Sequence, residues 1–475
     1  MRRGFSVHVH ALPQAPPSHF RAAWISFRQR RPLSTAFYVV LTVLRNILGC
    51  VFCALCANFC YSLGNIFTLR VSTYQSTESI IVANLVWTNV LYYGITLVTY
   101  STALQSQRFI TSPETRPSLR FCITKLARAT WRCYAVSVFL ILAWGILFVN
   151  MFPVTWRWMR LDFFIGATVN HIFAAAIARA TKHTYDHETC KGHLRRQKRA
   201  PQPTITDTNG SSSLNVPTQS RSFWRVYLKT FPEVMCAMGA GVYVQLASQN
   251  QLFSRGATAV LIFALVSFAV KLLLQELAKA YVMKRNIHQV YIMCMLVGLP
   301  TVLIDTQVRI IMLGKQSTNH ASAGTLTMAV SETLLRIGKV MLIKWQIRHR
   351  EAEVLCTDSA HQKQQILDFH TAEVMADMYA EYIAIACSAS ILFFFANNPK
   401  YQVVDDMTAS KVVQLQWLLV YQLGLEIVVD YVSCVFEIAV GVQFERVRKL
   451  SVFLAFMFMT IAVVNISISS FLYLK

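Results

Sequence analysis

The fold of this chain is decided by residues 412–442, which read VVQLQWLLVYQLGLEIVVDYVSCVFEIAVGV. A proline-free, mostly apolar run of this length predicts an α-helix that crosses a bilayer. Three carboxylates interrupt it, and at 100° per residue they fall within roughly 40° of one another along about 16 Å of the axis. They are Glu426, Asp430 and Glu437, called the acidic stripe below. Because a charge costs roughly 2.5–3.5 kcal/mol at mid-bilayer, we expect the stripe to face the protein interior.

The composition of the whole chain, like the run 412–442, indicates a membrane protein. Of the 475 residues, 55% are hydrophobic and only 14% are charged, which indicates an all-α, polytopic integral membrane protein. Apolar runs of transmembrane length predict about eleven helices, within a range of about nine to twelve. The runs are 36–68, 80–104, 133–152, 161–180, 226–247, 257–275, 288–313, 324–343, 380–397, 411–441 and 450–474. The proline residues Pro232 and Pro300 mark candidate helix breaks within two of these runs.

The net charge of +22 is distributed as membrane topology requires. With the N-terminus in the cytoplasm, the cytoplasmic segments hold 31 of the 45 lysine and arginine residues. This asymmetry explains the basic balance without nucleic acid as a partner. We expect a plasma-membrane or endomembrane protein whose main partner is the lipid bilayer. An arginine-rich start without acidic residues before Glu78 also fits organelle import, but Pro13, Pro16 and Pro17 interrupt the amphipathic helix that import needs.

Changes in composition along the chain predict four parts. Residues 1–35 form a cytoplasmic N-terminal segment, and 36–180 form a first transmembrane bundle of about four helices. Residues 181–225 form a basic and polar cytoplasmic linker whose composition predicts disorder. Residues 226–475 form a second bundle of about seven helices, with a cytoplasmic helical segment at 344–379.

The linker carries two features of its own. A basic run extends from Arg195 to Arg199, where anionic lipid headgroups could bind; a solvated topology determinant is the plainer interpretation. The sequence Asn209-Gly210-Ser211 is a glycosylation sequon, which the predicted topology leaves in the cytosol and unmodified.

Further ionisable residues lie inside other predicted helices. Glu332, Arg336 and Lys339 share one face of the run 324–343, and Asp305 and Arg309 are four residues apart in the run 288–313. Lys271 is alone in its run. Such residues mark ion or proton pathways by default. The alternative is that the cations neutralise the acidic stripe and only fix the positions of the helices.

A second acidic face precedes the run 380–397. His370, Glu373, Asp377 and Glu381 recur at steps of three and four residues, so they share one side of a helix. A solvated helix end is the plainer interpretation. The functional alternative is a cytoplasmic vestibule that collects cations.

Two patterns resemble metal-binding spacings. The first, C-x2-C-x2-C-x3-C at Cys50, Cys53, Cys56 and Cys60, occurs inside an apolar run and lacks the proline of iron–sulfur sites, so we expect no cofactor there. The second is a weak zinc-like cluster. Its residues are His183, His187, Cys190 and His193.

Together these features favour an ion- or proton-coupled transporter or channel that handles a small ion or solute. The alternative is a receptor-like or structural membrane protein whose charges form only a salt-bridge network. No sequence motif indicates an enzyme, and the oligomeric state is not indicated. The choice depends on whether the carboxylates outnumber the cations that can reach them.

Overall fold

The structure is a computed structural model, and it describes most of the chain. The described residues are 32–152, 160–197, 223–249, 257–285, 290–315, 326, 329–331, 333–343, 345, 358–401, 409–440, 442, 444 and 451–474.

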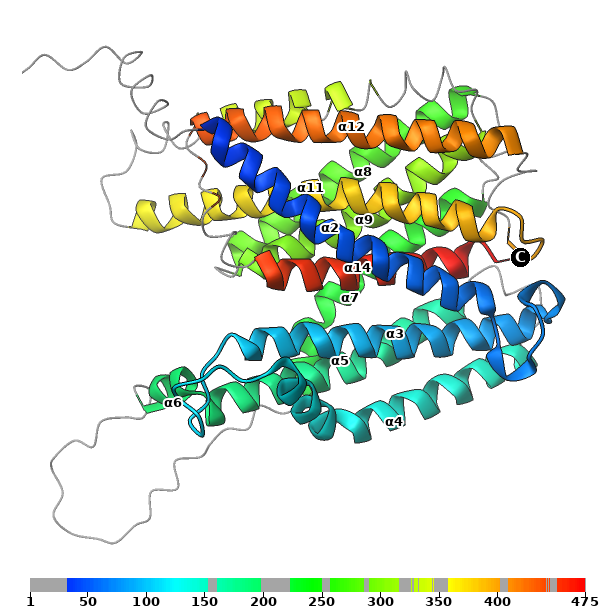
Figure 1. Cartoon of the computed structure of the whole chain (residues 1–475), viewed down its shortest axis with the longest axis horizontal. Coiled ribbons are helices and arrows are strands. Elements are labelled where there is room, and N and C mark those ends of the chain that lie inside the picture. Colours follow the sequence, from blue (N-terminus) through cyan, green and yellow to red (C-terminus); the bar gives the residue numbers. More distant parts are fainter. Residues whose placement is uncertain are drawn as a thin grey trace, which may run out of the picture.

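Within these residues the chain is helical, without a β-strand. Every predicted apolar run overlaps a helix, and the residues 333–343 form part of one more, called the 333–343 helix below. The labelled helices are α2 (Pro32–Leu63), α3 (Thr77–Gln105), α4 (Leu119–Met151), α5 (Leu161–Glu188), α6 (Cys190–Gln197), α7 (Phe223–Gln249), α8 (Ala257–Lys284), α9 (Val290–Lys315), α11 (Asp358–Phe395), α12 (Ala409–Val440) and α14 (Ser451–Leu472) (Figure 1).

Eight helices of the described part are long and apolar enough to cross a membrane. They are α2, α3, α4 and α5, followed by the spans Ile292–Leu313 in α9, Gln365–Phe395 in α11, Val413–Ala439 in α12 and Ser451–Leu472 in α14. The all-α membrane fold is therefore as predicted. The span in α11 begins earlier than the predicted run at 380, so it includes His370, Glu373 and Asp377.

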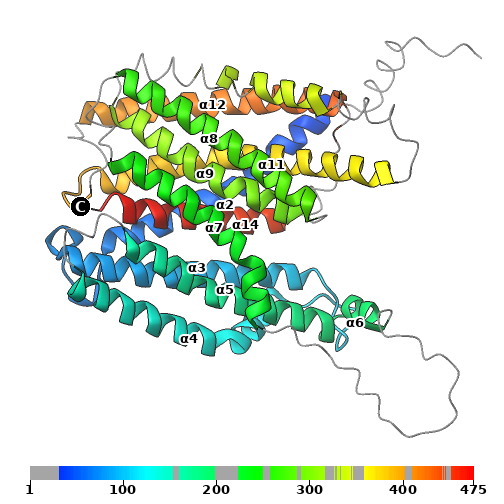
Figure 2. The same ribbon diagram turned by 180° about the vertical axis from the view of Figure 1, so that it is seen from behind.

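Most of the helices run side by side along one common direction (Figure 1). The helices α3, α4 and α5 pack together on one side, and α14 joins them to α2, α9 and α11. The helix α7 packs on both α5 and α9, and Figure 2 shows it crossing between the two groups. The helix α12 lies on the far side from α4, where it packs on α2 and α11.

The helix α2 is tilted against its neighbours and crosses α11 diagonally in Figure 1. Its 32 residues span about 48 Å, more than an upright helix needs to cross a hydrocarbon core of about 30 Å. Tilt accommodates such a length. The beginning of α2 and the end of α14 lie at opposite ends of the bundle (Figure 1).

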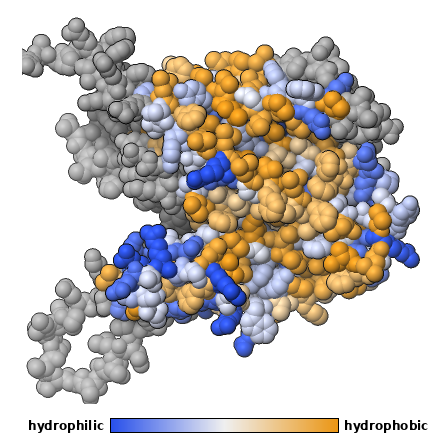
Figure 3. All heavy atoms as spheres, in the orientation of Figure 1, coloured by the Kyte–Doolittle hydropathy of each residue, from blue (hydrophilic) through white to orange (hydrophobic). Residues whose placement is uncertain are grey.

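The surface is consistent with lipid as the surrounding solvent. Large apolar side chains are exposed along the helices, including Phe52 of α2, Phe139 of α4 and Trp417 of α12. Figure 3 shows apolar residues over the middle of this face, with many of the hydrophilic residues gathered toward its ends. A soluble protein rarely exposes so large a contiguous apolar surface.

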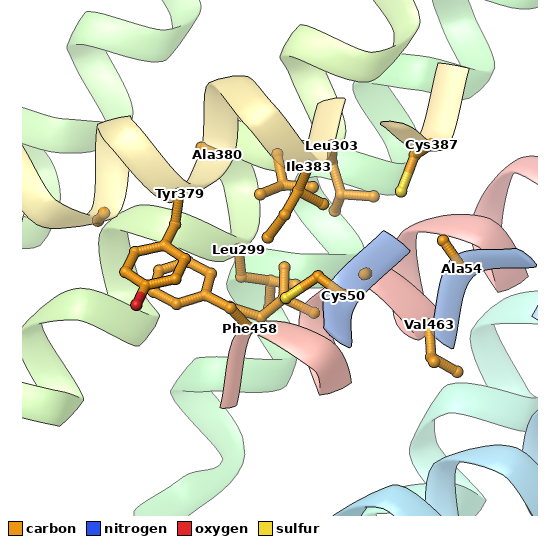
Figure 4. Close-up of a cluster of buried hydrophobic side chains, with 14 of the residues drawn as sticks. Cys50, Ala54, Leu299, Leu303, Tyr379, Ala380, Ile383, Cys387, Phe458 and Val463 are labelled. Carbon is orange, nitrogen blue, oxygen red and sulfur yellow. The ribbon is translucent and has the colours of Figure 1, made fainter. Parts of the chain in front are cut away.

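The hydrophobic core lies where α2, α9, α11 and α14 meet. Tyr379 of α11 stacks on Phe458 of α14, with ring centroids 4.3 Å apart, and Cys50 of α2 is buried beside them (Figure 4). Gly298 of α9 allows this close approach, because a Cβ atom there would lie 2.8 Å from the Phe458 ring. Asn46 of α2 closes the cluster by donating its amide to the Tyr379 hydroxyl at 2.7 Å.

The prolines do not break their helices. Pro232 lies within α7 and Pro300 within α9, and both helices continue through them. The predicted breaks at these positions are therefore wrong. Neighbouring helices support a proline-containing transmembrane helix, so the lost backbone hydrogen bond need not interrupt it.

Candidate functional site

The acidic stripe of α12 faces the protein interior, as predicted. Glu426, Asp430 and Glu437 are each at most 3% exposed. The opposite side of α12 is apolar and exposed, with Val420 and Val428 among its residues. This helix therefore has the reverse pattern of a soluble amphipathic helix: its polar face is inside and its apolar face is toward lipid.

The first two ion pairs link α9 to helices on either side. Arg309 donates from Nη2 to Glu426 Oε1 at 2.7 Å, and its Nη1 lies 3.5 Å from Gln422 Oε1. Four residues earlier on α9, Asp305 Oδ2 accepts from Lys271 Nζ of α8 at 2.9 Å. Asp305 and Arg309, predicted as a pair within one helix, thus each bond to another helix and connect α9 to α8 and α12.

The 333–343 helix places one guanidinium between two carboxylates of the stripe. Arg336 Nη1 donates to Asp430 Oδ1 at 2.5 Å, while its Nε lies 4.0 Å from Glu437 Oε1. A further bond from Nη2 reaches the carbonyl of Val374 in α11 at 3.4 Å. Both Glu437 oxygens are buried without a hydrogen-bonding partner. Asp430 is therefore tightly paired, and Glu437 is only near a cation.

The second cation of this helix does not reach the stripe. Lys339 Nζ donates to Glu373 Oε1 of α11 and to Gln275 Oε1 of α8, both at 2.8 Å. Gln275 in turn donates to Asp377 Oδ1 at 2.8 Å. The expectation that Lys339 neutralises the stripe is therefore wrong, because the carboxylate that it binds is Glu373 of α11.

The second acidic face is buried. His370, Glu373, Asp377 and Glu381 are between 2% and 9% exposed, so the interpretation as a solvated helix end is wrong. These residues lie on α11, which packs against α8, α9 and α12. Neither ring nitrogen of His370 has a hydrogen-bonding partner, and its Nδ1 lies 3.7 Å from Glu373 Oε2.

The charges of this network do not balance. We call it the charge network, and it joins α8, α9, α11, α12 and the 333–343 helix. Among the described residues it contains seven carboxylates, four lysine or arginine side chains and one histidine, His370. The carboxylates are Asp305, Glu373, Asp377, Glu381, Glu426, Asp430 and Glu437, and the lysine and arginine residues are Lys271, Arg309, Arg336 and Lys339.

Two uncharged residues beside the charge network, Gln275 and Tyr382, were not singled out from the sequence. Gln275 lies four residues after Lys271, so helical spacing places the two on one face of α8 and could have found it. Tyr382 of α11 is buried beside Asp430 and Glu381. An aromatic residue at the start of an apolar run gives no such signal in a sequence.

The zinc-like cluster has no support in the structure. Within the described residues, no group of three or more histidine, cysteine, aspartate or glutamate side chains is arranged to hold a metal ion. His183 and His187 stack on successive turns of α5 with ring centroids 4.4 Å apart. Along α2, Cys50 is buried whereas Cys56 is exposed, so the four-cysteine pattern does not surround a common point.

Some predicted residues lie outside the part that the structure describes. These are Glu332, the side chains of the basic run from Arg195 to Arg199, and the sequon at Asn209.

The fold and the site together define a class: a helical, multi-pass membrane protein with a buried network of ionisable side chains. Comparison with protein-family models, with curated proteins and with solved structures gave no match.

Proposed function

We propose that this protein is an ion- or proton-coupled transporter or channel, and that the charge network is its coupling site. The observation that carries the proposal is the excess of buried carboxylates over lysine and arginine side chains among the described residues of that network. A carboxylate buried without a counter-charge is costly. Binding a proton or a cation removes this cost, so the network has a built-in capacity for positive charge.

The distribution of the ion pairs supports an ion pathway more than a purely structural role in holding helices together. The paired charges occur on five helices rather than at one crossing point. Arg309 pairs with Glu426 and Arg336 with Asp430, one turn further along α12. Replacing buried ion pairs by apolar residues is often neutral or stabilising, so stability alone is a weak reason for keeping so many.

Orientation belongs to the same proposal. We infer about eleven transmembrane helices with a cytoplasmic N-terminus in the plasma membrane or an endomembrane. The support is the concentration of lysine and arginine in the segments that this topology places in the cytoplasm. The second acidic face, His370, Glu373, Asp377 and Glu381, then lies toward the cytoplasmic part of α11, as the vestibule interpretation requires. Glycosylation at Asn209 in cells would contradict this topology.

Flux through reconstituted vesicles tests the function. The full chain is placed in lipid vesicles that contain a pH-sensitive dye, and proton movement and uptake of radiolabelled sodium and rubidium are followed at several pH values. We expect pH-dependent flux from the wild type. The double variant Glu426→Gln with Asp430→Asn should lose it, because it removes two carboxylates of the stripe. Folding of each variant is verified by gel filtration.

Glu276→Gln is the matched control, since Glu276 is an exposed carboxylate of α8 outside the network. It should retain wild-type flux. Absence of flux in the wild type, or full flux in a folded double variant, would contradict the proposal and favour a structural or receptor-like role.

A further inference from the structure

Glu437 differs from the other two carboxylates of the acidic stripe. Arg309 and Arg336 donate hydrogen bonds to Glu426 and Asp430 at 2.7 and 2.5 Å, respectively. No such bond reaches Glu437, which is 1% exposed and has no hydrogen-bonding partner for either oxygen. Its nearest cation is Arg336, at 4.0 Å from Nε. A carboxylate desolvated to this degree needs a bound positive charge.

We propose that Glu437 binds the coupling proton, and that this proton decides whether Arg336 pairs with Asp430 alone or with both carboxylates. This inference rests on the function proposed above and names the ion. When a proton binds, an O–H bond forms on one carboxylate oxygen and the network loses one negative charge. No other atom is transferred.

The surroundings of Glu437 favour a proton over a metal cation. Metal cations bind to several oxygen ligands at once. The described residues contain no group of three or more acidic, histidine or cysteine side chains arranged in that way. The Glu437 oxygens also have no polar neighbour within hydrogen-bonding distance. A proton requires only one oxygen atom, so it is the cation that this position can accommodate.

The ionisable groups around Glu437 come from three elements. Arg336 faces it from the 333–343 helix, His370 and Asp377 face it from α11, and Asp430 lies two turns earlier on α12 itself. The helix α2, which also packs on α12, carries a single charged residue, Arg45, and this side chain is exposed. Of these groups, Arg336 is the nearest cation and always carries its charge, so it is the one that responds when Glu437 gains or loses its proton.

Arg336 can transmit the protonation of Glu437 to Asp430, because its guanidinium lies between the two carboxylates on α12. Asp430 and Glu437 are seven residues apart, about 10 Å along the axis, and the guanidinium reaches toward both. With Glu437 neutral, Arg336 stays on Asp430, which is the pairing found in the structure. With Glu437 ionised, attraction to the second carboxylate moves Arg336 to a position shared between Asp430 and Glu437, away from the carbonyl of Val374 on α11. Proton binding at one residue thereby changes contacts among three helices.

Infrared difference spectroscopy tests the proton site without requiring transport. The purified full chain is embedded in phosphatidylcholine bilayers, and spectra are compared between acidic and alkaline buffers, in water and in heavy water. We expect a carboxylic-acid carbonyl band that disappears as the pH rises. Glu437→Gln should lose this band, and it should fold, because glutamine has the same shape and removes an unpaired buried charge.

Two controls come from the same protein. Glu373→Gln removes a carboxylate that is paired with Lys339, and Glu276→Gln removes an exposed one. Both variants should keep the titrating band. A band that persists in Glu437→Gln, a band that is lost in Glu373→Gln instead, or no titrating band in the wild type overturns the assignment.

The flux measurement separates failure of this inference from failure of the proposed function. If the wild type carries ions but Glu437→Gln retains the same pH dependence, transport stands and the proton site is wrong. If the band titrates and depends on Glu437 while no flux occurs, the proton site stands and the transport function is wrong.

Discussion

Midway along α3, α4 and α5 the buried polar contacts join neutral side chains, whereas α8, α9, α11 and α12 bury charges. In the first group, Asn89 of α3 donates to Ser137 of α4 at 2.8 Å and to Asn170 of α5 at 2.6 Å. In the second group, Arg336 and Asp430 form an ion pair of 2.5 Å at less than one-tenth exposure. Both arrangements connect helices through buried hydrogen bonds.

The difference shows that transmembrane helices of this protein can be connected without buried charges. Midway along α3, α4 and α5, neutral amide and hydroxyl groups make the buried contacts at low desolvation cost. The charged side chains of this group, Lys125 paired with Glu188 and the buried Asp162, lie near helix ends. Each charge in the other group costs roughly 2.5–3.5 kcal/mol on insertion scales, and a buried pair recovers this only with good geometry. The charge network is therefore an expensive way to hold helices together, which is the physical reason to connect it with ion movement.

The largest test of this contrast removes one cation. Arg336→Met leaves Asp430 without its 2.5 Å partner and leaves Glu437 without its nearest cation. We expect a loss of about 3–5 kcal/mol in the free energy of unfolding, because breaking a buried pair leaves an uncompensated charge. Reversible unfolding in mixed detergent micelles measures it.

The control for this variant is Arg132→Met, at an exposed arginine of α4. An exposed substitution should stay within about 0.5 kcal/mol of the wild type. Equal losses in the free energy of unfolding at the two positions would mean that the buried ion pairs of Arg336 do not stabilise the protein.

A smaller effect is expected when both members of a pair are replaced. Lys271→Met and Asp305→Leu each remove one side of a 2.9 Å ion pair between α8 and α9. We expect each single variant to lose about 1.5–3 kcal/mol, since these are charged hydrogen bonds. The double variant should be more stable than either single one, because two apolar residues leave no buried charge.

The same unfolding assay gives the coupling free energy from the four proteins of this cycle. A coupling of about 0.5–3 kcal/mol is expected for residues in direct contact. Additive losses in the double variant would show that the two side chains act independently, and the contrast between charged and neutral helix contacts would weaken.

The sequence predicted the features of the charge network that depend on one helix at a time. The inward direction of Glu426, Asp430 and Glu437 follows from their spacing and from the cost of charge in lipid. The partners could not be predicted in this way. Lys339 binds Glu373 rather than the stripe, and Lys271 finds Asp305, because the choice depends on which helices become neighbours.

The length of the candidate membrane span in α11 was underestimated for a related reason. Polar residues before position 380 lower the hydropathy of that stretch, so the predicted run began too late. In the structure, Glu373 and Asp377 are buried, and their carboxylates accept hydrogen bonds from Lys339 and Gln275 on other helices. A hydropathy scan treats each polar residue as exposed to lipid, and it cannot include a partner that another helix supplies.

The smallest expected loss of stability is at the neutral hydrogen bonds between α3, α4 and α5. Asn89→Leu removes the hydrogen bonds to Ser137 and Asn170 and substitutes a side chain of similar size. We expect a loss of about 0.6 kcal/mol, and at most about 1.7, the range measured for hydrogen bonds between transmembrane helices. Unfolding in mixed micelles measures this loss, and Asn150→Leu is its control, because that exposed amide bonds only to Ile146 of its own helix. A loss at Asn89 as large as that at Arg336 would remove the distinction, since neutral and charged contacts would then stabilise the protein equally.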